Sequence, residues 1–273
     1  MLSNQQFERT RRLALSLAGI ELAERHRELL ARRSRRFGAL DGAGLDSLLR
    51  AAEEGETTAT QQFVRLLTTK FTGFFRHSQH FCIAAEHAIR AADHRGRARL
   101  WSAAAATGEE PYSLAMALIE ALGRDDPPAT ILATDVDVEA LAIGQQGEYG
   151  DAALRGLDPP RRERFLSETN VARRWSVAPA VRRLVEFRAL NLISEAWLVE
   201  GPFDVILCRN VLMYLETRHR YTVLERLASL LAPDGLLMID PAEHLGEAGH
   251  LFTPEAEAVY RRRGASCPQC PRP

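Results

Sequence analysis

The stretch Trp101–Ser113, WSAAAATGEEPYS, reads as a strand that turns into a helix. Small residues fill the turn, and Pro111 lies near the expected helix start. Such a turn is typical of nucleotide-binding α/β folds, because the backbone can approach the ligand closely and the helix start offers N–H groups. Glu109 and Glu110, however, stand where phosphates would bind. A carboxylate within about 4 Å would repel a pyrophosphate by several kcal/mol, so the pattern predicts a nucleoside ligand without one.

After residue 97, short apolar segments alternate with helical patterns. This alternation indicates an α/β fold with a parallel, doubly wound, Rossmann-like sheet. The expected strands are 98–104, 129–134, 183–189, 203–208 and 235–240. The expected helices are 111–122, 137–144, 194–199 and 217–231.

The residues before 97 show helical periodicity and no strand pattern. Helices are expected at 5–18, 21–37, 45–54 and 59–70. The span from about 145 to 187 interrupts the later alternation and is interpreted as an insertion that forms a small β subdomain. The expected units are an all-helical N-terminal domain over 1–75, an α/β domain over 76–262 and a disordered tail over 263–273.

The composition is that of an ordinary globular protein. Hydrophobic residues make up 46% and charged residues 26% of the 273 residues, and the net charge of −1 indicates no partner such as nucleic acid. No apolar run approaches the ~20 residues of a membrane span. The N-terminus lacks the apolar segment of a secretory signal. Four cysteines are too few for a disulfide scaffold, which favours a reducing cytoplasm.

Positive charge gathers near the N-terminus. Residues 1–40 contain nine arginines and four glutamates, a balance of +5. In the helix expected over 21–37, Arg25, Arg32 and Arg36 fall on one stripe at i, i+7 and i+11. This stripe is a candidate docking surface, and the alternative is that it is only a solvated face.

Polar residues follow several expected strands, at the edge where an open α/β sheet binds its ligand. Asp135 ends the second strand, where a carboxylate can accept both ribose hydroxyls of an adenosine. The alternative is that Asp135 caps the helix that follows. The two glutamates of the turn favour S-adenosylmethionine over NAD or ATP, because that cofactor carries a sulfonium and an ammonium group and no phosphate. Alternatively, they only interact with the helix dipole.

Six stretches, in this order and spacing, resemble the chemotaxis-receptor glutamate methyltransferase family of the CheR type. The resemblance covers about residues 5 to 262. The matching stretches are TTKFTGFFRHSQHF (68–81), RLWSAAAATGEEPYSLAMAL (99–118), ATDVDVEAL (133–141), VEFRALNL (185–192), FDVILCRNVLMYL (203–215) and LLAPDGLLMI (230–239).

The resemblance implies a helical receptor-docking domain, a methyltransferase domain and a small β subdomain. It implies methyl transfer from S-adenosylmethionine to glutamates of a chemoreceptor's cytoplasmic coiled coil, by a cytoplasmic monomer that needs no metal. Arg76 and Tyr214 are similar to the family residues nearest the reacting methyl. The implied cofactor contacts are Lys70, Thr72, Arg76, Glu110, Asp135, Asn191, Leu192, Arg209 and Asn210.

Two departures from the family pattern lie near this site. Lys70 stands where the family usually has asparagine, and His77 stands where an acidic or amide residue commonly follows Phe-Phe-Arg. Two other functions stay open from the residues: a methyltransferase with another substrate, and a non-catalytic cofactor-binding scaffold in a signalling complex. The Cys267 and Cys270 pair is too small a set for a structural zinc site.

Overall fold

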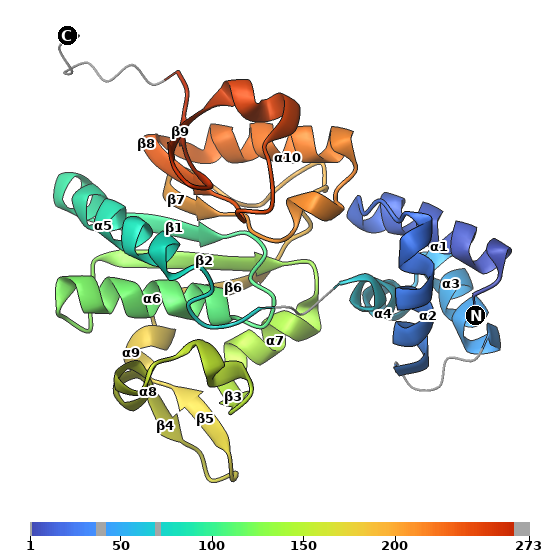
Figure 1. Ribbon diagram of the computed structural model, residues 1–273, viewed down its shortest axis with the longest axis horizontal. Helices are drawn as coiled ribbons and strands as arrows, with labels where there is room; N and C mark the ends of the chain where they lie inside the picture. The colour runs from blue at the N-terminus through green and yellow to red at the C-terminus, as the bar shows by residue number, and fades with distance from the viewer. Residues whose placement is uncertain (1, 37–41, 69–71, 265–273) are drawn as a thin grey trace.

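The computed structural model describes residues 2–36, 42–68 and 72–264, and only the backbone of Arg36, Gly42 and Ala43. Its N-terminal part, the helical region (residues 2–67), packs around a core in which Phe7, Leu49 and Phe63 are fully buried. Figure 1 shows this region beside the rest of the chain. Its elements are α1 (Asn4–Ala18), the 3₁₀ turn η1 (Glu24–His26), α2 (Arg27–Arg36), α3 (Gly42–Glu53) and α4 (Thr57–Leu67).

The remaining chain is built on a seven-stranded sheet in the order β6-β2-β1-β7-β8-β10-β9. The strands are β1 (Ala98–Ser102), β2 (Ala129–Asp135), β6 (Val185–Ala189), β7 (Phe203–Leu207), β8 (Leu231–Met238), β9 (Phe252–Ala256) and β10 (Val259–Arg262). From β6 to β8 neighbouring strands are parallel. The chain moves outward from β1 through β2 to β6 and then returns to β7 on the other side of β1. This reversal creates the crevice in which open α/β sheets bind their ligands.

Helices cover both faces of this sheet. Successive side chains of a strand point to opposite faces, so Leu100 joins the core under α5 (Ser78–Arg95) and α6 (Glu109–Leu122). Its neighbour Trp101 joins the other core, under α10 (Thr217–Leu230). None of the helices in the described ranges has the length and apolar character needed to span a bilayer.

A separate three-stranded antiparallel sheet lies within the insertion, in the order β3-β5-β4. The Asp158 side chain caps the helix at Pro159 by accepting the Arg161 N–H at 2.9 Å. The elements of the insertion and its flanks are α7 (Val138–Gln146), β3 (Glu148–Gly150), η2 (Ala153–Gly156), α8 (Pro159–Phe165), β4 (Leu166–Glu168), β5 (Arg174–Val177) and α9 (Pro179–Arg182).

The expected α/β class, with a helical N-terminal region and a mostly parallel sheet, is confirmed, and two local predictions are wrong. The helix expected over 194–199 is absent, because the Trp197 ring packs 5.5 Å from that of Trp101 and its indole donates to the Leu192 carbonyl. The helix expected over 21–37 begins as η1 and becomes α-helical only at α2. The strands β9 and β10 are not among those expected from the sequence, and β10 pairs antiparallel with both β8 and β9.

Candidate cofactor and methyl-transfer site

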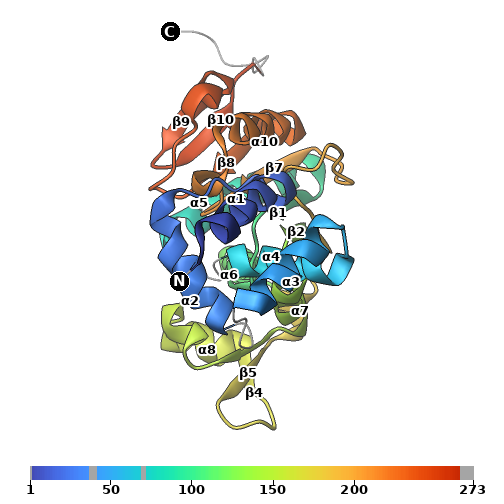
Figure 2. The ribbon, with the colours of Figure 1, turned by 90° about the vertical axis from the view of Figure 1, so that its right-hand side faces the viewer.

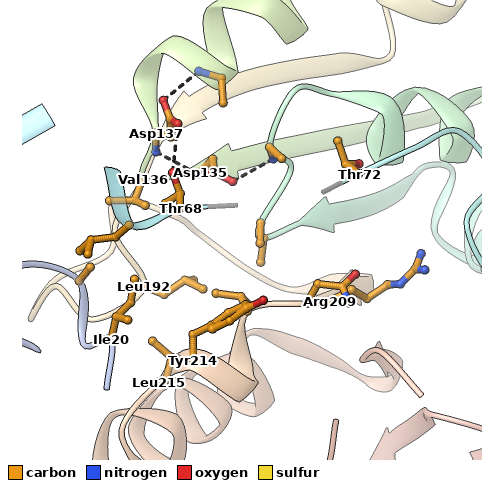
Figure 3. A pocket seen from close by; sticks show the side chains of 18 of the residues that line it. Ile20, Thr68, Thr72, Asp135, Val136, Asp137, Leu192, Arg209, Tyr214 and Leu215 are labelled. Atoms are coloured by element: carbon orange, nitrogen blue, oxygen red, sulfur yellow. Dashed lines mark hydrogen bonds between the residues drawn. The ribbon is translucent and has the colours of Figure 1, made fainter. Parts of the chain in front are cut away.

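The carboxyl ends of the parallel strands open into a cavity of about 310 Å³ (Figure 3). Its walls come from the turn after β1, from the ends of β2, β6 and β7, and from the helical region. Figure 2 looks from the helical side and shows α1–α4 in front of the sheet. The predicted site residues that line the cavity are Thr72, Arg76, Glu110, Asp135, Asn191, Leu192, Arg209, Asn210 and Tyr214.

The turn after β1 uses its backbone donors internally. The N–H of Ala105 donates to the Thr134 carbonyl, that of Ala106 to the Asp135 carboxylate, and that of Gly108 to the Ala105 carbonyl, each at 2.9 Å. These N–H groups therefore do not form the phosphate cradle that the small residues of the turn would allow.

Gly108 fixes how closely this turn packs. Its φ is +94°, and an added Cβ would lie 2.8 Å from the Gly144 Cα atom and 2.9 Å from the Tyr149 hydroxyl. That hydroxyl donates to the Thr107 carbonyl at 2.7 Å. Only glycine combines this backbone conformation with so close a contact.

Asp135 lies half-buried at the end of β2. Its carboxylate accepts the N–H groups of Ala106 and Asp137, each at 2.9 Å. A carboxylate offers about four acceptor positions, so Asp135 can accept further bonds from a ligand. Burial raises its pKa, although the backbone donors oppose this shift. The cap of α7 is Asp137, which accepts from Glu139 and Ala140, so the capping alternative for Asp135 is wrong.

The two glutamates of the turn diverge. Glu109 is buried, accepts a hydrogen bond from the Thr107 hydroxyl at 2.6 Å and does not line the cavity. Glu110 lines the cavity and accepts from the Ser102 hydroxyl at 2.8 Å. They separate because successive residues point about 100° apart around a helix. Burial raises the pKa of Glu110, partly offset by the Arg209 charge.

Arg209 joins three parts of the site. Its Nη1 lies 3.2 Å from Glu110 Oε2, and its Nη2 donates to the Arg76 carbonyl at 2.7 Å. The guanidinium also lies over the Phe81 ring, 5.6 Å from its centroid. Because its side chain is only 2% exposed, Arg209 mainly connects the segments that form the cavity wall.

Asp240, just beyond β8, binds the loop that follows β7. Its Oδ2 accepts from the Asn210 side chain at 2.6 Å and lies 3.6 Å from Arg76 Nη2 and 3.5 Å from His77 Nε2. Burial alone would raise its pKa, but the Ala242 N–H, the Asn210 side chain and the neighbouring Arg76 and His77 outweigh burial, so the pKa is lowered.

Glu243 supports the same loop. Its buried carboxylate accepts the N–H groups of Asn210 and Asp240 at 3.0 Å and of Met213 at 3.2 Å. Glu243 is not among the site residues predicted from the sequence. Glu243 is followed by His244, and no apolar periodicity around them indicates that this carboxylate is buried.

The helical region supplies one wall of the cavity. Ile20, Leu22 and Arg33 line it, and Ile20 lies next to the 3₁₀ turn η3 (Leu212–Tyr214), which contributes Tyr214. Figure 3 shows Ile20 and Tyr214 on neighbouring segments. The Tyr214 side chain is 40% exposed, so it lines an accessible part of the cavity. Sequence reasoning had not placed the helical region in the site.

The remaining predicted residues lie apart from the cavity or outside the description. Arg25 of η1 and Arg32 of α2 are exposed and do not line the cavity. Arg36 ends α2, and its side chain is not described. Lys70 and the tail from residue 265 lie outside the described residues.

The described geometry fits a phosphate-free ligand. The turn has no spare donors at Ala105, Ala106 and Gly108, and a carboxylate, Glu110, faces the cavity. The family model described as CheR methyltransferase, SAM binding domain, matches residues 70–260. This chain belongs to the CheR methyltransferase family.

Relatives in two bacteria match nearly the whole chain. Chemotaxis protein methyltransferase 2 of Pseudomonas aeruginosa is 38% identical over 261 residues, 94% of this chain and 93% of its own. The chemotaxis protein methyltransferase of Escherichia coli is 37% identical over 266 residues, 95% of this chain and 91% of its own. The expected family, enzyme class and S-adenosylmethionine cofactor are therefore confirmed: the chain is an S-adenosylmethionine-dependent chemotaxis methyltransferase.

Proposed function

We propose that this enzyme transfers methyl groups from S-adenosylmethionine to glutamate side chains of a chemoreceptor, forming γ-methyl esters that adjust chemosensory signalling. The observation that carries the proposal is the cavity itself. It has a carboxylate acceptor at Asp135 and a second carboxylate at Glu110, and the N–H groups of Ala105, Ala106 and Gly108 in the turn are bonded within the protein.

The cofactor contacts follow from the lining of this cavity. Asp135 would accept the ribose hydroxyls, and Asn191 and Leu192 at the end of β6 would border the base. Arg76 would pair with a carboxylate, because a guanidinium can bind one through two parallel bonds. Thr72, Glu110, Arg209 and Asn210 complete the proposed set, together with Lys70 on the strength of the resemblance.

The reaction asks the chain for positioning more than for acid–base chemistry. A glutamate carboxylate is already ionised at neutral pH, so it needs no general base. When bound, S-adenosylmethionine supplies a methyl group on a sulfonium, and the products are the ester and S-adenosylhomocysteine. The residues must hold the carboxylate in line and exclude water. Arg76 and Tyr214 are the proposed residues beside the reacting atoms, since the resemblance places them there and both line the cavity while partly exposed.

The helical region is the proposed docking unit. Arg25 and Arg32 are exposed, while Leu29 and Arg33 of the same helical stretch line the cavity. A receptor coiled coil bound to these arginines and Arg36 would thus lie near the site. We propose a monomer acting in the cytoplasm, with residues 1–75 for docking and 76–262 for transfer.

Transfer of a labelled methyl group tests this proposal. The enzyme is incubated with labelled S-adenosylmethionine and, separately, with receptor cytoplasmic fragments, duplex DNA and RNA. Label is expected in the receptor fragments alone. Label in nucleic acid would favour another substrate, and S-adenosylhomocysteine binding without any transfer would favour a scaffold.

A further inference from the structure

The segment that leaves α1 is paired with the loop that carries Tyr214. The N–H of Glu21 donates to the Tyr214 carbonyl, and the N–H of Glu216 donates to the Gly19 carbonyl, both at 2.9 Å. The residues between them form an antiparallel bridge. Figure 3 shows Ile20 beside Tyr214 at this point. The backbone of the helical region is therefore bonded directly to one wall of the site.

The same segment holds a second wall. The Asn191 side chain donates to the Leu17 carbonyl at 2.7 Å. Asn191 and Tyr214 both line the cavity, on the loops after β6 and β7. Residues 17–21 thus fix two loops that lie far from this segment in the sequence.

Gly19 makes this approach possible. It ends α1 with φ +65°, and its N–H bonds back to the Leu15 carbonyl at 3.0 Å. An added Cβ would lie 2.6 Å from Ile193 Cγ2 and 3.4 Å from the His219 ring. A side chain at position 19 would therefore push the segment away from the loop after β6 and from the first turn of α10, which directly follows the Tyr214 loop.

We propose that Gly19 is a positioning residue for methyl transfer. It does not line the cavity, and it acts through the backbone bonds that hold Tyr214 and through the contact of Leu17 with Asn191. This inference rests on the proposed function, because it assigns a role within the same reaction. It also makes the helical region part of the methyl-transfer site in addition to its docking role.

The first test compares Gly19→Ala with Gly55→Ala. Gly55 also lies in the helical region with a positive φ, +81°, but has no atom within 4 Å of an added Cβ. Both variants share the strain of a left-handed alanine, and only the first displaces the segment. Gly19→Ala is expected to lower kcat at least tenfold with the receptor KM within about twofold of wild type. Gly55→Ala is expected to keep the wild-type kcat within about twofold.

The second test removes one backbone bond and keeps the glycine. Glu216 has φ −58° and caps α10, so proline fits there and removes the N–H that bonds to Gly19 together with the Glu216 side chain. Glu216→Ala is the matched control, because it loses the side chain and keeps that N–H. Glu216→Pro is expected to lower kcat at least fivefold relative to Glu216→Ala, which covers the case in which Gly19→Ala does not fold.

Three results decide the inference. A double variant, Gly19→Ala with Ile193→Ala, removes the clashing Cγ2 and is expected to recover most of the lost kcat. Equal kcat values for Gly19→Ala and Gly55→Ala, or for Glu216→Pro and Glu216→Ala, would overturn the inference while wild-type transfer stands. Wild-type enzyme that methylates no receptor fragment would instead overturn the proposed function.

Discussion

Removing Arg209 tests how the site wall is held together. The Arg209 side chain is 2% exposed and its partner Glu110 is 12% exposed. Among the described residues, Arg209→Ala would leave the Ser102 hydroxyl, at 2.8 Å, as the one hydrogen-bond donor to the Glu110 side chain. Breaking a buried ion pair by removing one partner costs about 3–5 kcal/mol of folding stability.

This cost converts into a measurable shift in melting temperature. For domains of 150–250 residues, 1 kcal/mol shifts Tm by about 2–4 °C, so Arg209→Ala is expected to melt about 6–20 °C below wild type near pH 8. Burial already raises the pKa of Glu110, and the loss of Arg209 raises it further. A carboxyl with a raised folded-state pKa gives its stability at low pH and loses it as the pH rises through that pKa. The deficit of the variant is therefore expected to shrink toward pH 5.

Thermal melts from pH 5 to 8, followed by circular dichroism, measure both effects. Glu110→Gln in the Arg209→Ala background is expected to recover most of the loss at pH 8, because it removes the orphan charge. Arg124→Ala is the control, since its pair with Asp126 is exposed and should leave Tm unchanged. An Arg209→Ala melt within about 2 °C of wild type at pH 8, or a deficit that ignores pH, would refute this reasoning.

Three further outcomes test the assignments around the cavity. Asp135→Ala is expected to weaken S-adenosylhomocysteine binding by about ten- to a hundredfold, because a bond to a charged group contributes about 1.5–3 kcal/mol; calorimetry showing wild-type affinity would end the ribose assignment. The wild-type affinity for S-adenosylhomocysteine is expected to fall on acidification while the pH is still above the free-aspartate pKa of about 3.9, because burial raises the pKa of Asp135. A calorimetric affinity that does not change from about pH 8 to 4 would contradict this expectation. Changing Arg25, Arg32 and Arg36 together to alanine is expected to raise the receptor KM several-fold at unchanged cofactor affinity, since exposed charges contribute about 0.2–1 kcal/mol each. Added salt should raise the receptor KM of the wild-type enzyme in the same way in steady-state kinetics. A triple variant that instead loses cofactor binding would show that receptor docking is the wrong role for these arginines.

The sequence predicts those parts of the site that follow the ends of parallel strands. Asp135, Arg209 and Asn210 each come directly after an apolar strand, and the sheet order brings such positions to one edge. The small residues and the paired glutamates of the turn at 101–113 predict a ligand without phosphate groups. This prediction also depends only on residues that are neighbours in the sequence. Fold class and ligand chemistry are therefore readable from short-range patterns.

Long-range contacts account for what the sequence does not reveal. Glu109 and Glu110 look equivalent in the sequence, and only tertiary packing buries one and turns the other to the cavity. Glu243 acquires its role because three N–H groups from separate segments converge on it. The helical region joins the site through backbone bonds at Gly19 and Glu21, and backbone bonds leave no trace in side-chain patterns.

The chemical stability of the transferred methyl group tests the central claim most directly. Receptor cytoplasmic fragments are labelled by the wild-type enzyme with methyl-labelled S-adenosylmethionine, purified and exposed to high pH. A glutamate ester hydrolyses there and releases its label as methanol, whereas N-methyl groups persist. We expect release of the label as volatile methanol, with peptide mass spectrometry locating the methyl groups on glutamates. A base-stable methyl group, on the receptor or on any other substrate, would contradict the account.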